Sequence, residues 1–400
     1  MDNKKNGIPK LRFPGFTGAW EQRKWVDSIN ISNEMVDPTT GKFDDMPHIA
    51  PGNIESFTGR ILDNVKTVKE EELISGKFLF KPGDVVFGKI NPQLGKYFYA
   101  RVEGLTSADS YVLNGKNKNI TQMFIFLLLQ TRDFFKYSVS VSKRSGIPKI
   151  NREELNGFKF LIPCKEEQEK IGDFFLNIDS LITLHQRKLE HLQEQKKGLL
   201  QKMFPKNGET VPEVRFPGFT DAWEQRKLGG FLQEYSIKSK IENEYPLLSS
   251  TNKGMEYREG RTASESNIGY KILKINDLVL SPQNLWLGNI NINTLVTGIV
   301  SPSYKTLKIN NLSLYFLLPQ LKTKRMLEKY KQVSVQGASV VRRNLDFTEF
   351  MNISLVIPTN KEQEQIGEFF KQLDSLIALH QRKLDHLELM KKGLLQQMFV

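Results

Sequence analysis

Polar and basic side chains that could bind DNA gather in four short stretches of this 400-residue chain. Arg and Lys can donate hydrogen bonds to guanine edges or phosphates, and Asn and Gln can pair with adenine. The candidates in the first half are Lys89, Asn91, Gln93, Lys96, Lys143, Arg144 and Lys149, and those in the second half are Gln283, Asn284, Trp286, Gln336, Arg342 and Arg343. Variable surface loops and solvated basic loops are the alternative interpretations.

Catalytic motifs are missing from the same stretches. Asn91-Pro92-Gln93-Leu94 lacks the second proline and the aromatic residue of the adenine methyltransferase motif. The segment from Gly88 to Lys96 has six residues rather than four between its glycines, and Tyr97 stands where a P-loop has Ser or Thr. The chain has no Pro-Asp dipeptide, and its five histidines lack metal-triad spacing. We therefore expect no catalytic residue, metal or cofactor in this chain, which is not an enzyme by itself.

The composition indicates a globular protein with a polyanionic partner. The chain is 39% hydrophobic and 26% charged, and its net charge is +12. This excess of Lys and Arg favours nucleic acid first and an anionic membrane second. The single cysteine, Cys164, excludes an intramolecular disulfide, and the longest apolar run, Met123 to Leu129, is too short to cross a bilayer. We expect a cytoplasmic protein without a membrane partner.

Two internal repeats organise the chain. Arg12 to Lys24 reads RFPGFTGAWEQRK, and Arg215 to Lys227 repeats it with one change. Ile162 to Phe204 matches Ile357 to Phe399 at roughly two thirds identity. The near-identical frames enclose two inserts, 25–161 and 228–356, that hardly resemble each other.

The two inserts nevertheless share a faint skeleton. Lys81 to Gly95 aligns without a gap with Lys274 to Gly288, so we expect one fold with different side chains on its loops. Short apolar runs broken by Gly, Pro and Asn predict strands, including 84–87 and 278–280. Helices are predicted over 120–136 and 312–331. The inserts are therefore expected to be mixed α/β domains.

The second repeat predicts a long helix, because Glu166 to Phe204 contains no proline and its apolar residues follow a heptad. The other copy has the same phase, so the two helices can pack as an intramolecular antiparallel coiled coil, about 60 Å long at about 1.5 Å per residue. Polar seam positions, including Lys196 and Lys391, either fix the register or mark another contact. The predicted seam comprises Ile171, Phe175, Ile178, Ile182, His185, Leu189, Leu192, Ile366, Phe370, Leu373, Ile377, His380, Leu384 and Leu387.

We thus predict an α+β protein with pseudo-twofold architecture, in which two mixed α/β domains are separated by two long helices. The expected division is 1–162 for the first domain, 163–205 for the first helix, 206–357 for the second domain and 358–400 for the second helix. Trp20 and Trp223 occur in blocks that differ at one position, which favours packing over base stacking.

The paired RFPGFT blocks, the two divergent inserts and the two PxxxEQ helices with HQRKL resemble type I restriction-modification specificity subunits over the whole chain. The resemblance implies that each insert is a target-recognition domain for one half of a bipartite double-stranded DNA site, and that the coiled coil sets their spacing. It also implies two modification subunits that methylate adenine, and restriction subunits that hydrolyse ATP. S-adenosylmethionine, ATP and Mg would then bind the partner subunits. The alternative is a coiled-coil scaffold or decoy that binds modification subunits without directing them to a sequence.

Overall fold

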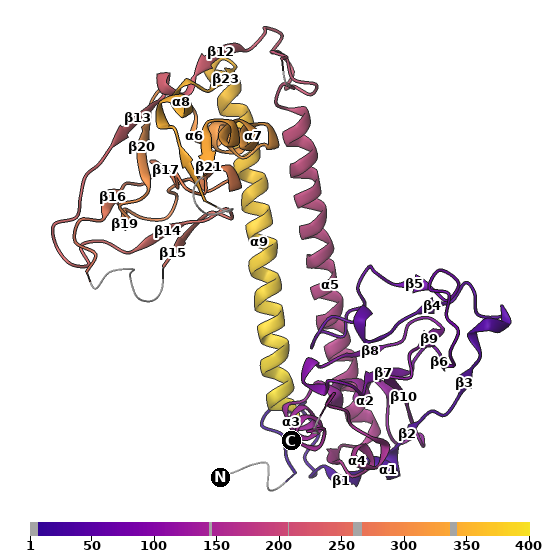
Figure 1. Cartoon of the computed structure of the whole chain (residues 1–400). Helices are drawn as coiled ribbons and strands as arrows, with labels where there is room; N and C mark the ends of the chain where they lie inside the picture. Colours follow the sequence, from indigo (N-terminus) through magenta and orange to yellow (C-terminus); the bar gives the residue numbers. More distant parts are fainter. Residues whose placement is uncertain (1–6, 144–145, 207, 259–265, 337–341) are drawn as a thin grey trace. The chain divides into compact units, whose positions relative to one another are not determined.

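The computed structural model describes residues 7–143, 146–206, 208–258, 266–336 and 342–400. The chain forms two compact units, Met1–His185 with Lys383–Val400, and Gln186–Arg382. We refer to them as unit 1 and unit 2. Each unit contains one insert and a part of each long helix, α5 (Lys165–Lys202) and α9 (Asn360–Met398) (Figure 1).

Unit 1 is a mixed α/β domain built on two main sheets. The first has the order β2-β10-β7-β8, and its strands are Ile29–Ile31, Ser110–Gly115, Val85–Gly88 and Tyr97–Tyr99. The second has the order β3-β6-β9-β4-β5, and its strands are Met35–Val36, Lys77–Phe80, Gly104–Thr106, Pro47–His48 and Lys66–Thr67. A separate antiparallel pair joins β1 (Glu21–Lys24) to β11 (Lys159–Ile162). The short helices are α1 (Trp25–Ser28), α2 (Gln122–Leu129), α3 (Arg132–Val141) and α4 (Arg152–Asn156).

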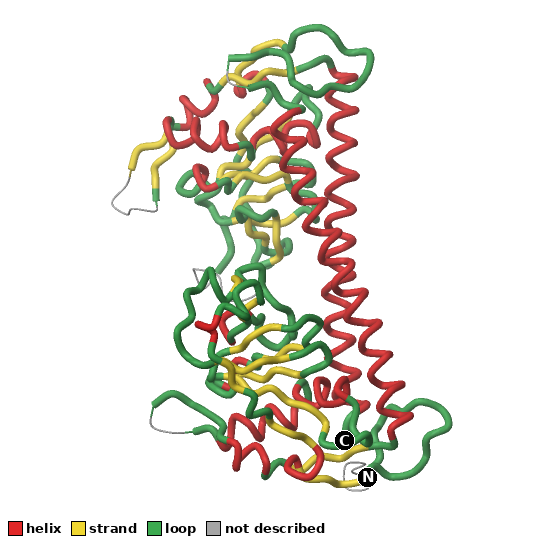
Figure 2. Tube along the Cα trace, turned by 90° about the vertical axis from the view of Figure 1, so that its right-hand side faces the viewer, coloured by secondary structure: helices red, strands yellow, loops and turns green. Residues whose placement is uncertain are grey.

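Unit 2 repeats the first sheet, and strands of the second sheet recur as separate pairs that isolated bridges connect. Its four-stranded sheet has the order β13-β20-β17-β18, with strands Leu232–Tyr235, Lys305–Ile309, Leu278–Leu280 and Ile290–Ile292. The pair β12 (Glu224–Lys227) and β23 (Ser354–Ile357) corresponds to β1 and β11. The remaining strands pair as β14 (Leu248–Ser250) with β15 (Met255–Tyr257), β16 (Lys271–Leu273) with β19 (Gly298–Val300), and β21 (Ser334–Gln336) with β22 (Arg343–Leu345). The helices are α6 (Leu314–Leu321), α7 (Lys324–Gln332) and α8 (Phe347–Asn352). Figure 2 shows the strands of the chain in yellow and its helices, including the two long ones, in red.

The predicted common skeleton of the inserts is confirmed. Strand β7, the 3₁₀ turn η4 (Pro92–Leu94) and strand β8 occupy the same alignment positions as β17, η6 (Leu285–Leu287) and β18. Each turn ends at a glycine in the left-handed region, Gly95 with φ 55° and Gly288 with φ 86°. Glycine adopts this conformation without the steric cost of a Cβ. The two inserts are therefore one fold with different loops.

The predicted single helices over 120–136 and 312–331 are wrong, because each is two helices. In unit 1 the helix breaks between α2 and α3, where the Thr131 hydroxyl accepts a hydrogen bond from the Phe134 backbone N–H at 3.3 Å. Thr323 caps α7 in the same way through the Met326 N–H. A threonine in this role satisfies a helix N-terminus and starts a new helix with a new direction.

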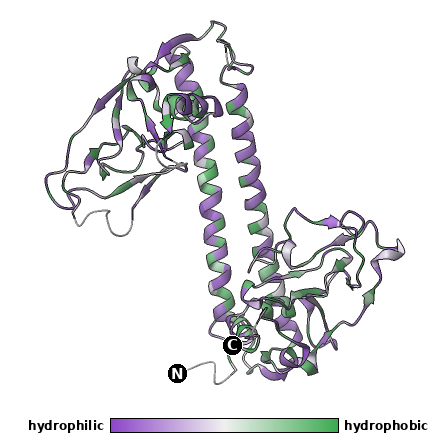
Figure 3. Cartoon of the chain, in the orientation of Figure 1, coloured by the Kyte–Doolittle hydropathy of each residue, from purple (hydrophilic) through white to green (hydrophobic). Residues whose placement is uncertain are grey.

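The predicted antiparallel pairing of the long helices is confirmed. In unit 1 the Lys391 Nζ of α9 lies 2.7 Å from Asp179 Oδ1 of α5, and in unit 2 the Lys196 Nζ of α5 lies 2.5 Å from Asp374 Oδ1 of α9. From the first pair to the second, the residue number rises on α5 and falls on α9, so the two helices run in opposite directions. Apolar and polar residues alternate along both helices (Figure 3). These two equivalent ion pairs support the interpretation that the polar seam lysines fix the register.

Each insert core is completed by the end of the long helix from the other repeat. In unit 1 the Phe399 ring stacks on Phe124, with centroids 5.3 Å apart, and meets Trp20 edge-on at 5.8 Å. In unit 2 Phe204 meets Trp223 edge-on at 6.0 Å and Phe316 at 5.6 Å. Both tryptophans are buried, as expected for packing residues. Each repeated tryptophan block therefore holds a helix end against an insert.

The repeated PxxxEQ motif joins the RFPGFT block to the long helix. Arg12 donates from Nε and Nη2 to the two Glu167 carboxylate oxygens, each at 2.7 Å, and Arg215 makes the same bidentate contact with Glu362 at 2.6 and 2.7 Å. The next residue, Gln168, accepts a hydrogen bond from the Thr121 backbone N–H just before α2. The motif therefore fixes the repeated frame against the insert in both units.

Candidate nucleic-acid interface

The two stretches of unit 1 that carry DNA-binding candidates lie side by side. Ile90 pairs with Lys149 as an isolated antiparallel bridge. The Asn91 N–H donates to the Pro148 carbonyl oxygen at 2.7 Å, and the Ile150 N–H donates to the Lys89 carbonyl oxygen at 3.0 Å. The loop after β7 and the loop after α3 are thus held together by backbone hydrogen bonds, although more than fifty residues separate them in sequence.

The candidates of unit 1 divide into exposed side chains and side chains used inside the domain. Gln93, Lys143 and Lys149 are exposed, and Lys89 and Asn91 are half-buried. The half-buried Lys96 ammonium donates to the Ile54 carbonyl oxygen, so it serves the fold. Arg144 lies outside the described residues. Gln93, Lys143 and Lys149 are therefore the candidates with most freedom to contact DNA.

The corresponding two stretches of unit 2 also meet. The Arg343 backbone N–H donates to the Gln283 carbonyl oxygen at 3.2 Å, and Arg343 pairs with Gln336 across the β21–β22 hairpin. The Arg343 guanidinium also donates to the Ser334 carbonyl oxygen at 2.8 Å. Trp286 is half-buried against the unit 2 core and Asn284 is half-buried in the turn, whereas Gln283, Gln336 and Arg342 are exposed. The unit 2 candidates most accessible to DNA are therefore Gln283, Gln336 and Arg342.

Three cationic side chains gather near Tyr111 and the joined loops of unit 1. The Lys89 Nζ lies 5.0 Å from the centroid of the Tyr111 ring, and the Arg152 guanidinium carbon lies 5.7 Å from the same centroid. Burial lowers the pKa of Lys89, nearby Lys149 and Arg152 lower it further, and Asp109 opposes the change. Sequence reasoning missed Arg152, whose guanidinium donates to the Ile31 and Ser32 carbonyl oxygens at 3.1 and 2.9 Å and so serves the fold. The signal available in the sequence was that Arg152 lies three residues after the candidate Lys149.

Unit 2 has a different cationic cluster that sequence reasoning also missed. Lys305 at the start of β20 lies 2.7 Å from Glu234 and 4.5 Å from the centroid of the Phe347 ring. Burial lowers the pKa of Lys271, and Lys305 and Lys238 lower it further against the opposing effect of Glu234. The lysines come from separate strands and a loop, so no local sequence pattern marks them.

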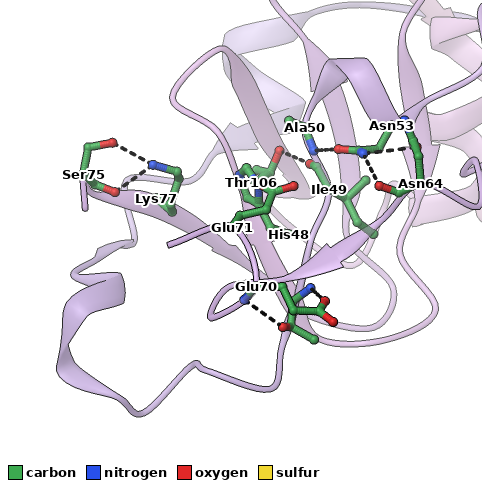
Figure 4. A network of polar contacts seen from close by, with 11 residues as sticks. His48, Ile49, Ala50, Asn53, Asn64, Glu70, Glu71, Ser75, Lys77 and Thr106 are labelled. Atoms are coloured by element: carbon green, nitrogen blue, oxygen red, sulfur yellow. Dashed lines mark hydrogen bonds and ion pairs between the residues drawn. The ribbon is translucent and has the colours of Figure 1, made fainter. Parts of the chain in front are cut away.

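A polar network lies around the buried His48 of unit 1. Figure 4 shows His48 beside Glu71, whose Oε2 lies 2.6 Å from His48 Nδ1, and Lys77 bound to Ser75. His48 is buried. Among the described residues no cluster of three or more His, Cys, Asp or Glu side chains could hold a metal ion. The described helices are also too short or too polar to cross a bilayer.

A groove of about 870 Å³ in unit 2 lies between α5, α7 and β23 and combines apolar and cationic side chains. Phe204, Met326 and Val356 line it together with Lys196 and Lys322. The Lys322 Nζ donates to Asn291 Oδ1 at 2.6 Å. Burial, aided by Lys196 and opposed by Asp374, lowers the pKa of Lys322 to about 8.

This lysine should make the stability of unit 2 depend on pH. Its pKa in the folded chain lies below the ordinary 10.5, so between about 8 and 10.5 the unfolded chain binds more protons. The free energy of unfolding should therefore increase as pH rises from about 8 to about 10.5. Below about 8 this lysine should give no such increase. The free energy of unfolding in urea should be measured for the unaltered chain and for Lys322→Met at pH 7 and at pH 10. Relative to the value for Lys322→Met, the value for the unaltered chain should be higher at pH 10 than at pH 7. Equal differences at both pH values would contradict this assignment.

Comparisons with known proteins agree with this architecture. The family model described as type I restriction modification DNA specificity domain matches residues 20–194 and 221–389. The type I restriction enzyme EcoDI specificity subunit of Escherichia coli is 29% identical over 170 residues, which are 42% of this chain and 37% of the relative. The MjaVIII specificity subunit of Methanocaldococcus jannaschii is 24% identical over 75% of this chain and 74% of the relative. The chain thus spans little more than a third of the first relative and about three quarters of the second.

Solved structures show the same fold. The S subunit of the type I restriction-modification system from M. genitalium has a TM-score of 0.66 and 14% sequence identity, over 98% of this chain and 99% of that one. A chain from a structure describing complex assembly and conformational transition of the type I R-M system has a TM-score of 0.51 and 16% identity, over 98% and 99% of the two chains.

Proposed function

The chain belongs to the type I restriction-modification DNA specificity family, and from this premise we propose that its two inserts read the two halves of one bipartite DNA site. The chain is a specificity subunit with two DNA-recognition domains. In this proposal unit 1 contacts one half-site and unit 2 the other, and the paired helices set the gap between them. The specificity subunits in this family are non-catalytic, so methylation and cleavage belong to partners.

The proposal rests on one observation: both units contain a pair of loops joined by a backbone hydrogen bond, although the two insert sequences have diverged. In unit 1 the Asn91 N–H binds the Pro148 carbonyl oxygen, and in unit 2 the Arg343 N–H binds the Gln283 carbonyl oxygen. The exposed side chains on the joined loops differ between the units. A fixed backbone platform with different hydrogen-bonding side chains is what two readers of different base sequences require.

Partner docking is proposed for the outer surface of the long helices. Leu181 and Leu184 on α5 are exposed, and their repeat equivalents Leu376 and Leu379 on α9 are exposed as well. Two equivalent apolar pairs offer two equivalent sites, one for each of two modification subunits. These subunits would carry S-adenosylmethionine, and restriction subunits that join the complex would carry ATP and Mg.

The experiment that tests the function is a map of methylated adenines in a methylation-deficient host. The host expresses this chain with its modification subunit, and the control expresses the modification subunit alone. We expect one bipartite motif, whose halves change one at a time when 25–161 or 228–356 is exchanged for the insert of another specificity subunit. Stable complexes without any motif would instead favour the scaffold or decoy alternative.

The docking proposal predicts a stepwise loss of partners. The double substitution Leu181→Glu and Leu184→Glu should weaken one modification-subunit site by about thirtyfold, because it places two charges in an apolar contact. Adding Leu376→Glu and Leu379→Glu should weaken the second site as well. Native mass spectrometry of the purified complexes would count the bound subunits. Leu389→Glu, an exposed leucine elsewhere on α9, serves as the control, and an unchanged stoichiometry in the fourfold variant would refute these docking sites.

A further inference from the structure

The groove of unit 2 between α5, α7 and β23 is strongly cationic. Among the described residues that line it, the acidic ones are Glu328 and Asp374, and Asp374 already pairs with Lys196. The basic side chains that line it are Lys196, Lys197, Lys206, Lys322, Lys324 and Arg325. The groove therefore has an excess of positive charge, which an anionic ligand would offset.

Lys322 is a partly buried cation whose hydrogen bonds, within the described part of the chain, go to neutral oxygens. Its ammonium donates to Asn291 Oδ1 at 2.6 Å and to the Asn252 carbonyl oxygen at 3.3 Å. An ammonium has three N–H donors, so one remains for a ligand. Burial lowers the pKa of Lys322 to about 8, because the nearby carboxylate of Asp374 does not offset the loss of hydration.

Two buried polar atoms of residues that line the groove have no hydrogen-bond partner among the described residues. They are Gln320 Oε1 and Arg325 Nε. Gln320 is only 6% exposed, and its Nε2 already donates to the Val356 carbonyl oxygen at 3.1 Å. A buried polar atom without a partner is unfavourable. A ligand with an N–H donor for Gln320 and an anionic acceptor for Arg325 would satisfy both atoms.

The start of α7 and an apolar surface complete the groove. The helix begins at Lys324, and the Thr323 hydroxyl accepts a hydrogen bond from the Met326 N–H at 3.4 Å. The first N–H groups of a helix carry partial positive charge and favour a phosphate group. Phe204, Met326 and Val356 supply the apolar surface. A volume of about 870 Å³ suits a small molecule that combines a phosphate group with an apolar body.

The equivalent place in unit 1 differs, although the surrounding frame is repeated. The pocket beside the break between α2 and α3 has a volume of about 210 Å³. Counted from the capping threonine of each unit, Asp133 stands where unit 2 has Arg325, and Gln130 stands where unit 2 has Lys322. The larger cationic groove is therefore a feature of unit 2 and does not follow from the repeat.

We propose that the groove of unit 2 binds one nucleoside phosphate per chain. The phosphate group lies against Lys322, Lys324 and the first N–H groups of α7, and it also accepts from Arg325 Nε. The base packs on the apolar surface and donates an N–H to Gln320 Oε1. This site concerns a ligand of the chain itself, so it does not depend on which DNA sequence the inserts read.

Calorimetric titration of the full chain tests the ligand class. The chain is titrated with AMP, GMP, CMP and UMP, with the nucleoside of the tightest binder, and with inorganic phosphate. We expect one nucleotide per chain and affinities at least about tenfold lower for the nucleoside and for phosphate, because each keeps only some of the contacts. Binding of phosphate or of the nucleoside as tightly as the nucleotide would overturn the nucleoside phosphate, and no binding of any nucleotide would overturn the site.

Charge-reversal variants locate the site. Lys324 is exposed, so Lys324→Glu should leave the fold intact and weaken nucleotide binding at least about tenfold. Lys331→Glu makes the same charge change at an exposed position of α7 outside the groove, and Arg132→Glu reverses the charge at the equivalent exposed position of unit 1. Both should leave the affinity unchanged. Equal losses from the three variants would show general attraction of an anion and would overturn the assigned site.

Proton uptake gives a readout specific to Lys322. A bound phosphate raises the pKa of this lysine above 8, against the opposing effect of Lys196 and in the same direction as Asp374. At about pH 8.5 nucleotide binding should therefore take up a fraction of a proton, measured from binding heats in buffers of different ionisation enthalpy. Lys322→Met should abolish this uptake. Binding to the unaltered chain without proton uptake would overturn the contact between the phosphate and Lys322.

Discussion

Replacing Glu362 with alanine is expected to destabilise unit 2 by about 3–5 kcal/mol. The Glu362 carboxylate is fully buried and accepts two hydrogen bonds from Arg215, which is itself largely buried. Alanine leaves the Arg215 guanidinium charge buried without a counter-ion. The Nη1 atom of Arg215 already has no hydrogen-bond partner. Hydrogen exchange measured by mass spectrometry should show lost protection in the unit 2 segments around 215 and 362.

Two variants separate this effect from a general loss of charge. Glu224→Ala breaks the exposed ion pair with Arg226 and should change the unfolding free energy by less than about 0.5 kcal/mol. The double variant Arg215→Met and Glu362→Leu should recover much of the lost stability, because no buried charge remains. A double variant as unstable as Glu362→Ala would show that the ion pair itself, rather than the uncompensated charge, supports the frame.

The repeat architecture could be predicted because it depends on patterns that are local in sequence. The heptad predicts Ile171, Phe175 and Ile366 in the helical seam, and these buried side chains lie in hydrophobic clusters that also contain side chains of the inserts. The gap-free alignment of 81–95 with 274–288 located the strands and the 3₁₀ turn, because strand and turn residues are regularly spaced.

The contacts that complete the site could not be predicted in the same way. The bond between the Asn91 N–H and the Pro148 carbonyl oxygen joins backbones far apart in sequence, and nothing in the side chains marks it. The Arg12–Glu167 ion pair spans 155 residues and follows no periodicity. The helix breaks at Thr131 and Thr323 were missed because the flanking apolar residues favour helix on both sides, and only the capping hydroxyl marks the boundary.

Replacing Phe399 with alanine should cost unit 1 about 3–5 kcal/mol, the range for removing a packed aromatic side chain from a core. The ring closes the unit 1 core against Trp20 and Phe124, although it belongs to the helix of the second repeat. The loss includes both the transfer of the ring to water and the cavity left between two large aromatic side chains. Phe204→Ala should have the equivalent effect on unit 2, where Phe204 packs against Trp223 and Phe316.

The two phenylalanine variants make the dependence of each domain on the other repeat testable. In hydrogen exchange, Phe399→Ala should release amides around Trp20 and α2 while those around Trp223 keep their protection, and Phe204→Ala should do the reverse. Leu389→Ala, on α9 but exposed, should change the unfolding free energy by less than about 0.5 kcal/mol. If Phe399→Ala left the amides around Trp20 protected, the insert core would be stable without the helix end. An insert could then be exchanged without regard to the repeat that follows it, whereas a loss of protection would require Phe399 and Phe204 to be kept in any exchange.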